Sequence, residues 1–395
     1  MKFIFSDASV FSHDNHLKKY TEFSAEAGIS NDCFIDCSKY YIFPGFVDVH
    51  VHFREPGFSY KETIATGSAA AARGGYEAVC TMPNLDPVPD SLYNLNQQLD
   101  IINKDAKMKV LPFGSITRAQ GGKELSDLEA MAPFVCGFSD DGRGVDNSSL
   151  MREAMQRAKA LGKVISAHCE DGTQIKDSPE AEWKQIERDI KLADEIGVKY
   201  HVCHISTKES VSLIRDAKAS GVDITCETAP HYLLFSEKDV KDDGRFRMNP
   251  PIREEADKLA LLEGICDGTI DMIATDHAPH SAEEKSRGLK SLNGIVGLEC
   301  AFPVLYTELV KKGVIPIEKL ISLMSTAPAA RFGIELDGFC VYDLDNEYAI
   351  DVNDFASMGR CTPFESKKVF GKCLATVSGT KLAYLDEKLY KNVKI

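Results

Sequence analysis

A chain of 395 residues is too long for one minimal domain, and with 44% apolar and 27% charged residues it can build a sizeable core. The formal net charge of −14 argues against nucleic acid or an anionic membrane surface as the main partner. No stretch approaches the roughly 18 apolar residues of a membrane span, and the first residues reach an aspartate before an apolar run of signal-peptide length forms. The twelve cysteines include no CxxC pair, as is usual for reduced thiols, so we expect a cytoplasmic protein.

Short apolar runs alternate with helical segments from residue 46 onward. Helix signals separate the runs, as in SSLMREAMQRAKALGK (148–163), which is predicted to begin with a serine cap and to end at a glycine. Strands that alternate with helices predict an α/β fold of parallel βαβ units, and eight of them predict a closed, TIM-like (β/α)8 barrel. The predicted strands are 46–53, 77–83, 109–117, 134–141, 163–170, 199–206, 223–229 and 271–278.

Residues 1–42 and 335–395 differ from this pattern. Strand-like stretches alternate with turn residues in both segments, as in FIFSDASVF near the start and FCVYDLDNEYAID near the end. We expect the two segments to meet in a small composite β module, beside a barrel formed by residues 43–334.

Histidines gather at the ends of the predicted strands, which is the edge where the active sites of such barrels lie. His50 and His52 share one face of the first strand, because side chains two residues apart point the same way. His231 follows the seventh strand by two residues. Seven of the ten histidines lie in or just after strand ends, at positions 50, 52, 168, 201, 204, 277 and 280.

Nitrogen and carboxylate donors from separate strands would meet at this edge. His168 ends the fifth predicted strand, His204 the sixth and Asp276 the eighth. Such a mixed set of donors suits zinc or a similar divalent cation. The alternative is a set of hydrogen-bonded core histidines without a metal. We disfavour it because so many buried polar groups would each need a partner.

Seven motifs carry a resemblance to a known family. In chain order they are DVHVHFREPG, CTMPN, FSDDG, AHCED, CHISTKES, RMNPPIR and ATDHAPH, and they lie between residues 43 and 302. The series resembles that of the dihydroorotase family, which belongs to the amidohydrolase superfamily. The arginine of HFREPG, the asparagine of TMPN and the whole of DHAPH are the specific parts, whereas HxH alone indicates only the superfamily.

The resemblance implies one or two zinc ions per subunit, bound around a shared aspartate. Many amidohydrolases carry a carboxylated lysine at the end of the fourth strand, but FVCGFSDDG contains no lysine. The resemblance instead places the bridging carboxylate at Asp141, with Asp140 facing away. One metal would be held by His50, His52, Asp141 and Asp276, and the other by Asp141, His168 and His204.

The resemblance also implies a reaction, the reversible hydrolytic ring opening of L-dihydroorotate to N-carbamoyl-L-aspartate in pyrimidine biosynthesis. A metal-bound hydroxide would attack the ring carbonyl, because divalent cations lower the pKa of bound water. Asp276 would act as general acid and base, taking a proton from the attacking oxygen and passing it to the leaving amide nitrogen.

Substrate binding is implied for a further set of residues near these ligands. Arg54 follows His52 by two residues, shares its inward face and would bind the substrate carboxylate, whereas an exposed ion pair is the alternative. Asn249 would bind the ring amide, with a simple turn before Pro-Pro as the alternative. Gly294 would end a flexible loop that closes on the substrate. The full set is Arg54, Asn84, Asn249, His280 and Gly294.

Two other functions stay open. A hydantoinase or dihydropyrimidinase opens similar cyclic amides, but these relatives usually carry the strand-four lysine and lack the arginine of HFREPG. A non-catalytic dihydroorotase homologue that serves as a scaffold for aspartate transcarbamoylase would typically have lost metal ligands, and all of them are present here. The sequence leaves open a homodimer and an association of the active enzyme with aspartate transcarbamoylase. We expect supporting or packing roles for His201 and His231.

Overall fold

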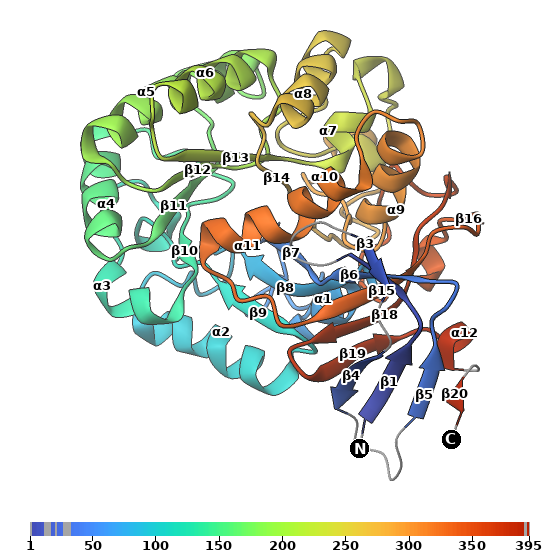
Figure 1. Cartoon of the computed structure of the whole chain (residues 1–395). Coiled ribbons are helices and arrows are strands. Elements are labelled where there is room, and N and C mark those ends of the chain that lie inside the picture. The colour runs from blue at the N-terminus through green and yellow to red at the C-terminus, as the bar shows by residue number, and fades with distance from the viewer. Residues whose placement is uncertain (1, 12–16, 20–21, 27–32, 391–392, 395) are drawn as a thin grey trace.

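Eight short parallel strands form the centre of the computed structural model, which describes residues 2–11, 17–19, 22–26, 33–390 and 393–394 (Figure 1). All eight predicted strands are present, and each is shorter than its predicted run. They are β7 (Phe46–Val51), β8 (Tyr76–Thr81), β9 (Lys109–Pro112), β10 (Gly137–Phe138), β11 (Val164–Ala167), β12 (Tyr200–Val202), β13 (Ile224–Thr228) and β14 (Met272–Ile273).

The eight strands are divided between two parallel sheets. β7, β8 and β9 form one sheet, and β10 to β14 form the other, each in chain order. Single parallel bridges join the sheets at both seams, from Gly114 to Phe138 and from Val51 to His277. The ladder of hydrogen bonds is therefore interrupted at each seam, and the arrangement is that of a (β/α)8 barrel.

The backbone after β7, β12 and β14 departs from the strand conformation earlier than predicted. Arg54, His204 and Asp276 have φ angles of 58°, 31° and 48°. These values lie outside the β region, so the chain has left the strand conformation at each of the three residues. Non-glycine residues at positive φ are uncommon and cluster at functional sites, where the surrounding structure holds them in place.

Helices cover the outside of the barrel (Figure 1). α4 begins at Ser148, but the predicted serine cap is wrong. The side chain of Asn147 is the cap and accepts hydrogen bonds from the N–H groups of Ser149 and Leu150.

No helix in the described ranges is long and apolar enough to span a membrane. The helices up to residue 267 are α1 (Ile64–Arg73), α2 (Leu92–Asp105), α3 (Leu128–Met131), α4 (Ser148–Ala160), α5 (Pro179–Ile196), α6 (Lys208–Ala219), α7 (Pro230–Leu234) and α8 (Glu255–Asp267).

Four short helices follow the last barrel strand: α9 (Ala301–Leu305), α10 (Ile317–Ile321), α11 (Ala327–Phe332) and α12 (Glu387–Tyr390). α11 brings Phe332 against the barrel interior, with ring centroids 5.8 Å from Phe113 and 5.3 Å from His201. Buried side chains such as Val47 and Met272 belong to the same apolar cluster. This cluster forms an apolar layer in the barrel interior, on which the polar residues at the strand ends lie.

The two ends of the chain build one ten-stranded sheet beside the barrel, in the order β20-β5-β1-β4-β19-β18-β15-β6-β2-β3. N-terminal and C-terminal strands lie in it as successive blocks, which meet where β5 pairs with β20, β4 with β19 and β6 with β15. The division of the chain at residues 42 and 335 stays a prediction. The strands are β1 (Lys2–Ser6), β2 (Ser9–Phe11), β3 (Leu17–Lys19), β4 (Glu22–Glu26), β5 (Cys33–Asp36), β6 (Tyr41–Pro44), β15 (Phe339–Asp343), β18 (Lys372–Ser378), β19 (Lys381–Leu385) and β20 (Val393–Lys394).

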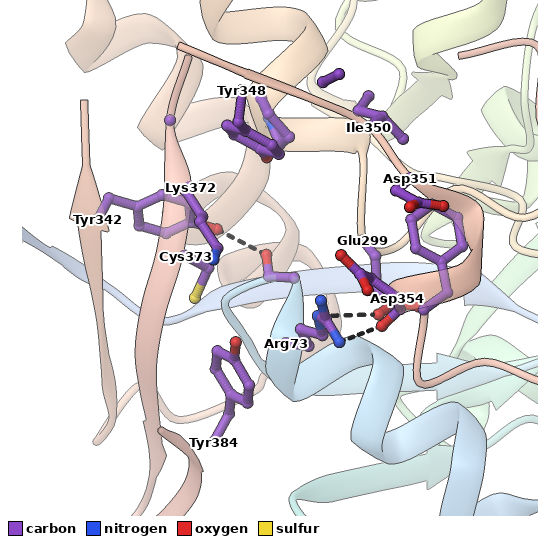
Figure 2. Close-up of a pocket in the computed structure, with 15 residues that line it drawn as sticks. Arg73, Glu299, Tyr342, Tyr348, Ile350, Asp351, Asp354, Lys372, Cys373 and Tyr384 are labelled. Carbon is purple, nitrogen blue, oxygen red and sulfur yellow. Dashed lines mark hydrogen bonds and ion pairs between the residues drawn. The ribbon is translucent and has the colours of Figure 1, made fainter. Parts of the chain in front are cut away.

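A cavity of about 220 Å³ lies at the junction of this sheet with the barrel (Figure 2). Arg73, at the end of α1, donates to the backbone carbonyl of Asp354, and its Nε lies 3.4 Å from the carboxylate of Glu299. The hydroxyl of Tyr342, on β15, donates to the carbonyl of Gly74 at 2.7 Å. The Tyr342 contact fastens the end of the first barrel helix to the sheet, and the Arg73 contacts hold it to the segments around residues 299 and 354. A separate two-stranded sheet, β16 (Tyr348–Ala349) and β17 (Lys368–Val369), lies nearby in the chain.

Candidate active site

The six predicted metal ligands converge at the C-terminal edge of the barrel strands. Each comes from a strand or from the turn that follows it, and none is more than 7% exposed, so their polar atoms are shielded from water. Buried polar groups require partners, so these six side chains must be paired with one another or with a bound group. The six are His50, His52, Asp141, His168, His204 and Asp276.

Asp141 lies at the centre of the cluster. Its Oδ1 is 3.2 Å from Nε2 of His50, 3.5 Å from Nε2 of His204 and 3.6 Å from Nδ1 of His168. Its Oδ2 is 3.4 Å from Nε2 of His52. Burial alone would raise the pKa of Asp141, but the surrounding imidazoles, His50 foremost, hold that pKa well below its usual range.

Asp276 is the second carboxylate that contacts the two histidines of β7 and the turn after it. Its Oδ1 lies 3.1 Å from Nε2 of His52 and 3.7 Å from Nε2 of His50. Asp141 and Asp276 therefore approach the histidine pair of β7 from two sides. This is the arrangement expected where two carboxylates and several imidazoles share cations.

The donor atoms of this cluster fit a divalent cation. In the described part of the chain, Nε2 of His50 and Oδ1 of Asp141 have no hydrogen-bond partner although both are buried. Two triplets have ligand atoms within 4.8 Å of one another, one from His50, His52 and Asp276 and one from His50, Asp141 and His204. Buried lone pairs without donors are costly, and a zinc-type cation is the partner that nitrogen and carboxylate donors suit.

Asp140 occupies a different environment from its neighbour. Its carboxylate accepts hydrogen bonds from the N–H groups of Ile116 and Thr117, at 2.8 and 3.1 Å, and from the Thr117 hydroxyl. Burial raises the pKa of Asp140 to about 6. Asp140 thus fastens the loop after β9, and Asp141 is the aspartate that faces the histidines.

Carboxylates behind the ligands form a layer that the sequence analysis missed. Glu227 on β13 lies 2.6 Å from Nδ1 of His50 and 3.0 Å from Nε2 of His201. Glu170 lies 3.2 Å from Nε2 of His168, and this contact is the main reason why its pKa is lowered to about 2. Glu227 could have been recognised in the sequence, because it is an acidic residue inside the predicted buried strand ITCET.

Asp48 ties the first barrel strand to the last. Its carboxylate accepts hydrogen bonds from the hydroxyl of Thr275 at 2.6 Å, from the Thr275 N–H at 3.1 Å and from the His50 N–H at 3.0 Å. Burial raises the pKa of Asp48 to about 7. The hydrogen bonds from Thr275 to Asp48 hold the backbone next to Asp276, whose own φ angle is 48°.

A cavity of about 270 Å³ opens beside the cluster, and all five predicted substrate-binding residues line it. The ligands His52, Asp141 and Asp276 also line it, so a molecule in the cavity would reach both groups. The five substrate-binding residues are Arg54, Asn84, Asn249, His280 and Gly294.

Arg54 makes no ion pair with a carboxylate in the described residues. Its Nε donates to the carbonyl of Pro279 at 3.2 Å, and its Nη2 lies 3.4 Å from Nε2 of His280. Asn84 donates to the backbone carbonyl of Asp141 at 2.6 Å. The exposed ion pair considered for Arg54 is therefore absent, and the guanidinium is available to an anion in the cavity.

Asn249 and Gly294 both line this cavity. Asn249 donates to Glu170 at 3.1 Å, so it also supports the residue behind His168. Gly294 has a φ of 134°, and a Cβ at this position would lie 2.4 Å from the carbonyl oxygen of Ala278. Only glycine fits here without a shift of the backbone.

The segment between His280 and Gly294 is held by buried polar contacts. Nζ of Lys285 donates to the carbonyls of Arg247 and Leu292, at 3.0 and 2.8 Å. Burial lowers the pKa of Lys285 to about 8. The flexible loop expected here stays a prediction.

The two unassigned histidines differ in their surroundings. His201 contacts Glu227 and the hydroxyl of Thr225, so it belongs to the layer behind His50. His231 is buried, and burial lowers its pKa to about 4. Its ring lies 4.2 Å from that of Tyr232, between centroids.

Comparisons with known proteins agree with the fold and the motifs. A family model described as "Dihydro-orotase-like" matches residues 40–182. A dihydroorotase of Fusobacterium nucleatum is 46% identical over 411 residues, which cover 97% of this chain and 96% of that protein. A dihydroorotase of Bacillus thuringiensis is 45% identical over 381 residues, which cover 89% of each.

Solved structures with the same fold include two hydantoinases. The L-hydantoinase of Arthrobacter aurescens has a TM-score of 0.86 at 23% identity, over 97% of this chain and 96% of that one. The D-hydantoinase of a Thermus species has a TM-score of 0.83 at 22% identity, over 97% and 95%. Taken with the buried cluster of imidazoles and carboxylates and with the relatives above, this barrel defines a metal-dependent cyclic amidohydrolase. Within that class, the chain belongs to the dihydroorotase family.

Proposed function

We propose that the chain catalyses the reversible ring opening of L-dihydroorotate to N-carbamoyl-L-aspartate. The observation that carries this proposal is the position of Arg54, a guanidinium without a carboxylate partner in the described residues, on the same cavity as His52, Asp141 and Asp276. A cyclic amide with a carboxylate outside the ring would place its negative charge on Arg54 and its amide at the cluster. The relatives named dihydroorotase support this assignment.

The proposed cofactor is zinc, as one or two ions per subunit. His50, His52, Asp141 and Asp276 would hold one ion, and Asp141, His168 and His204 the other. The cation, when bound, supplies an acidified water and polarises the carbonyl under attack. The buried lone pairs on His50 and Asp141 support this ligand set.

Asp276 is proposed as the general acid and base. It lines the cavity and lies next to His52, so its carboxylate can reach both the attacking water and the ring nitrogen. It would take a proton from the water during attack and deliver it to the leaving amide nitrogen. In the biosynthetic direction the same carboxylate would move the proton back.

Substrate orientation falls to residues around Arg54. Arg54 would bind the substrate carboxylate through two N–H donors, with Asn84 and His280 beside it. Asn249, which also lines the cavity, would contact the ring amide. Gly294 would contact the substrate through its backbone, at a position where any other residue would place a Cβ against Ala278.

Ring-opening assays with three substrates test this function. Purified protein with zinc would be given L-dihydroorotate, dihydrouracil and hydantoin, and the Asp276→Asn variant would serve as the inactive control. We expect turnover of L-dihydroorotate alone, lost in the variant. Turnover of only the two rings without a carboxylate would overturn the assignment of Arg54 and favour a hydantoinase. No turnover of any ring by metal-loaded protein would favour a non-catalytic scaffold.

The cytoplasmic location, a homodimer and an association with aspartate transcarbamoylase are also proposals. The free thiols among the described cysteines support a reducing compartment. Sedimentation of the pure protein, alone and with the transcarbamoylase of the same cell, would test both associations. A monomeric protein in both samples, with no species that contains both proteins, would contradict them.

A further inference from the structure

Glu227 is a carboxylate with 0% exposure inside the barrel, where an unpaired charge would be costly. Its Oε1 lies 2.6 Å from Nδ1 of His50, and its Oε2 lies 3.0 Å from Nε2 of His201. The backbone N–H of His204 also donates to Oε1, at 3.3 Å. One side chain therefore contacts two of the proposed ligands, His50 through its ring and His204 through its backbone.

These hydrogen bonds determine which nitrogen of each histidine carries a proton. An ionised carboxylate can only accept, so His50 donates from Nδ1 and His201 donates from Nε2. The hydroxyl of Thr225 lies 2.8 Å from Nδ1 of His201, to which it can donate. In a neutral His50, the form that can bind a metal, Nε2 is then left as a lone pair, and this is the nitrogen that lies 3.2 Å from Asp141.

We infer that Glu227 is a positioning residue for the metal centre, which fixes His50 with its Nε2 lone pair toward the cluster and holds the backbone of His204. His201 in turn orients Glu227. The inference rests on the proposed function, because it requires a metal at this cluster. His204 has a φ of 31°, a strained conformation that persists only where neighbouring groups hold it.

The expected effect of Glu227 is on metal affinity. A carboxylate that accepts from the far nitrogen of a ligating histidine fixes the ring and makes it more basic, and loss of such a partner weakens metal binding by about 10- to 100-fold. Glu227→Gln offers one acceptor and one donor in place of two acceptors. Either His50 or His201 must then lose its partner or move its proton, and a reversed His50 would present an N–H to the cation.

Two variants and a control separate this role from a loss of packing. Glu227→Asp keeps the charge but shortens the side chain, so we expect a smaller loss of affinity than for Glu227→Gln. His201→Leu leaves Glu227 and all six proposed ligands in place, and we expect an intermediate loss. Asp189→Asn is the control, because Asp189 is a buried carboxylate on α5 that accepts from the hydroxyl of Tyr200 at 2.8 Å.

The experiment is a competition between each folded protein and a chelator of known zinc affinity, with circular dichroism and urea unfolding of the metal-free forms as folding controls. We expect zinc affinity to fall by about 10- to 100-fold in Glu227→Gln and to stay at the wild-type value in Asp189→Asn. Wild-type affinity in folded Glu227→Gln would overturn the inference. If Glu227→Gln does not fold, wild-type affinity in His201→Leu would overturn it. Failure of the wild-type protein to bind zinc would instead contradict the proposed function.

Discussion

The guanidinium of Arg54 lies 3.4 Å from the imidazole of His280. Burial, together with the charge of Arg54, lowers the pKa of His280 to about 4, so that this ring is neutral near pH 7. No carboxylate in the described residues forms an ion pair with Arg54. The two residues thus present to the cavity one positive charge without an ion-pair partner among the described residues, which is the charge that a substrate carboxylate requires.

Replacing this charge should affect charged and uncharged rings differently. Arg54→Met removes charge-assisted hydrogen bonds of about 3 kcal/mol, so we expect kcat/KM for L-dihydroorotate to fall by about 100-fold. Steady-state kinetics with both L-dihydroorotate and dihydrouracil would measure it. Arg118→Met is the control, because Arg118 is exposed and forms an ion pair only with the exposed Glu124 among the described residues. An equal loss for the two rings would show that Arg54 does not bind the carboxylate.

The two neighbouring aspartates should separate metal binding from stability. Asp141→Asn places an amide among the imidazole nitrogens, and we expect loss of bound zinc. Asp140→Asn keeps an acceptor for the N–H groups of Ile116 and Thr117, so we expect full metal content and a loss of about 1–2 kcal/mol in stability. Metal analysis and urea unfolding of both variants would check this. Zinc loss in Asp140→Asn with retention in Asp141→Asn would reverse the assignment.

Gly294 should be required for space as well as for conformation. Gly294→Ala would bring a Cβ to 2.4 Å from the Ala278 carbonyl on the cavity wall, and we expect at least a tenfold rise in KM for L-dihydroorotate. Gly313 has a φ of 73°, and a Cβ at that position would meet no atom within 4 Å, so Gly313→Ala tests strain alone. We expect Gly313→Ala to lose about 1 kcal/mol of stability and to keep its KM. Equal KM values in the two variants would contradict the prediction.

The stability of the fold should fall with rising pH because of Glu77 on β8. Burial raises the pKa of its carboxyl from 4.5 to about 7. A group that stays protonated in the folded chain contributes stability below its unfolded pKa, and that contribution is lost as pH rises through the folded pKa. Glu77→Gln cannot ionise. Its free energy of unfolding should therefore rise relative to the wild type by up to about 3 kcal/mol between about pH 4.5 and pH 8.

Urea unfolding at several pH values in that range would measure the difference. The exposed Glu335 provides the matched control, and Glu335→Gln should differ from the wild type by a constant amount. A constant difference for Glu77→Gln as well would show that this carboxyl ionises alike in the folded and unfolded chain.

The sequence alone predicted the barrel fold and the residues that gather at the C-terminal edge of its strands. Strand periodicity is local, and side chains two apart share a face, so His50 and His52 could be placed from their spacing alone. The choice of Asp141 over Asp140 came from a motif and agrees with the positions of the two side chains in the structure.

Contacts between distant strands could not be predicted in this way. Glu227 and His50 are 177 positions apart, and only the arrangement of the strands in the barrel brings their side chains to 2.6 Å. Asp48 and Thr275 meet across a seam for the same reason. His204 and Asp276 have positive φ angles shortly after β12 and β14, a departure from the strand conformation that local propensity does not predict.

The most direct test is to titrate metal-free protein with zinc while following the ring opening of L-dihydroorotate. We predict no turnover without metal, and activity that rises in proportion to zinc until one or two ions per subunit are bound. Full turnover by the metal-free protein, or none after zinc has bound at that ratio, would contradict the assignment of the buried cluster as the catalytic metal centre.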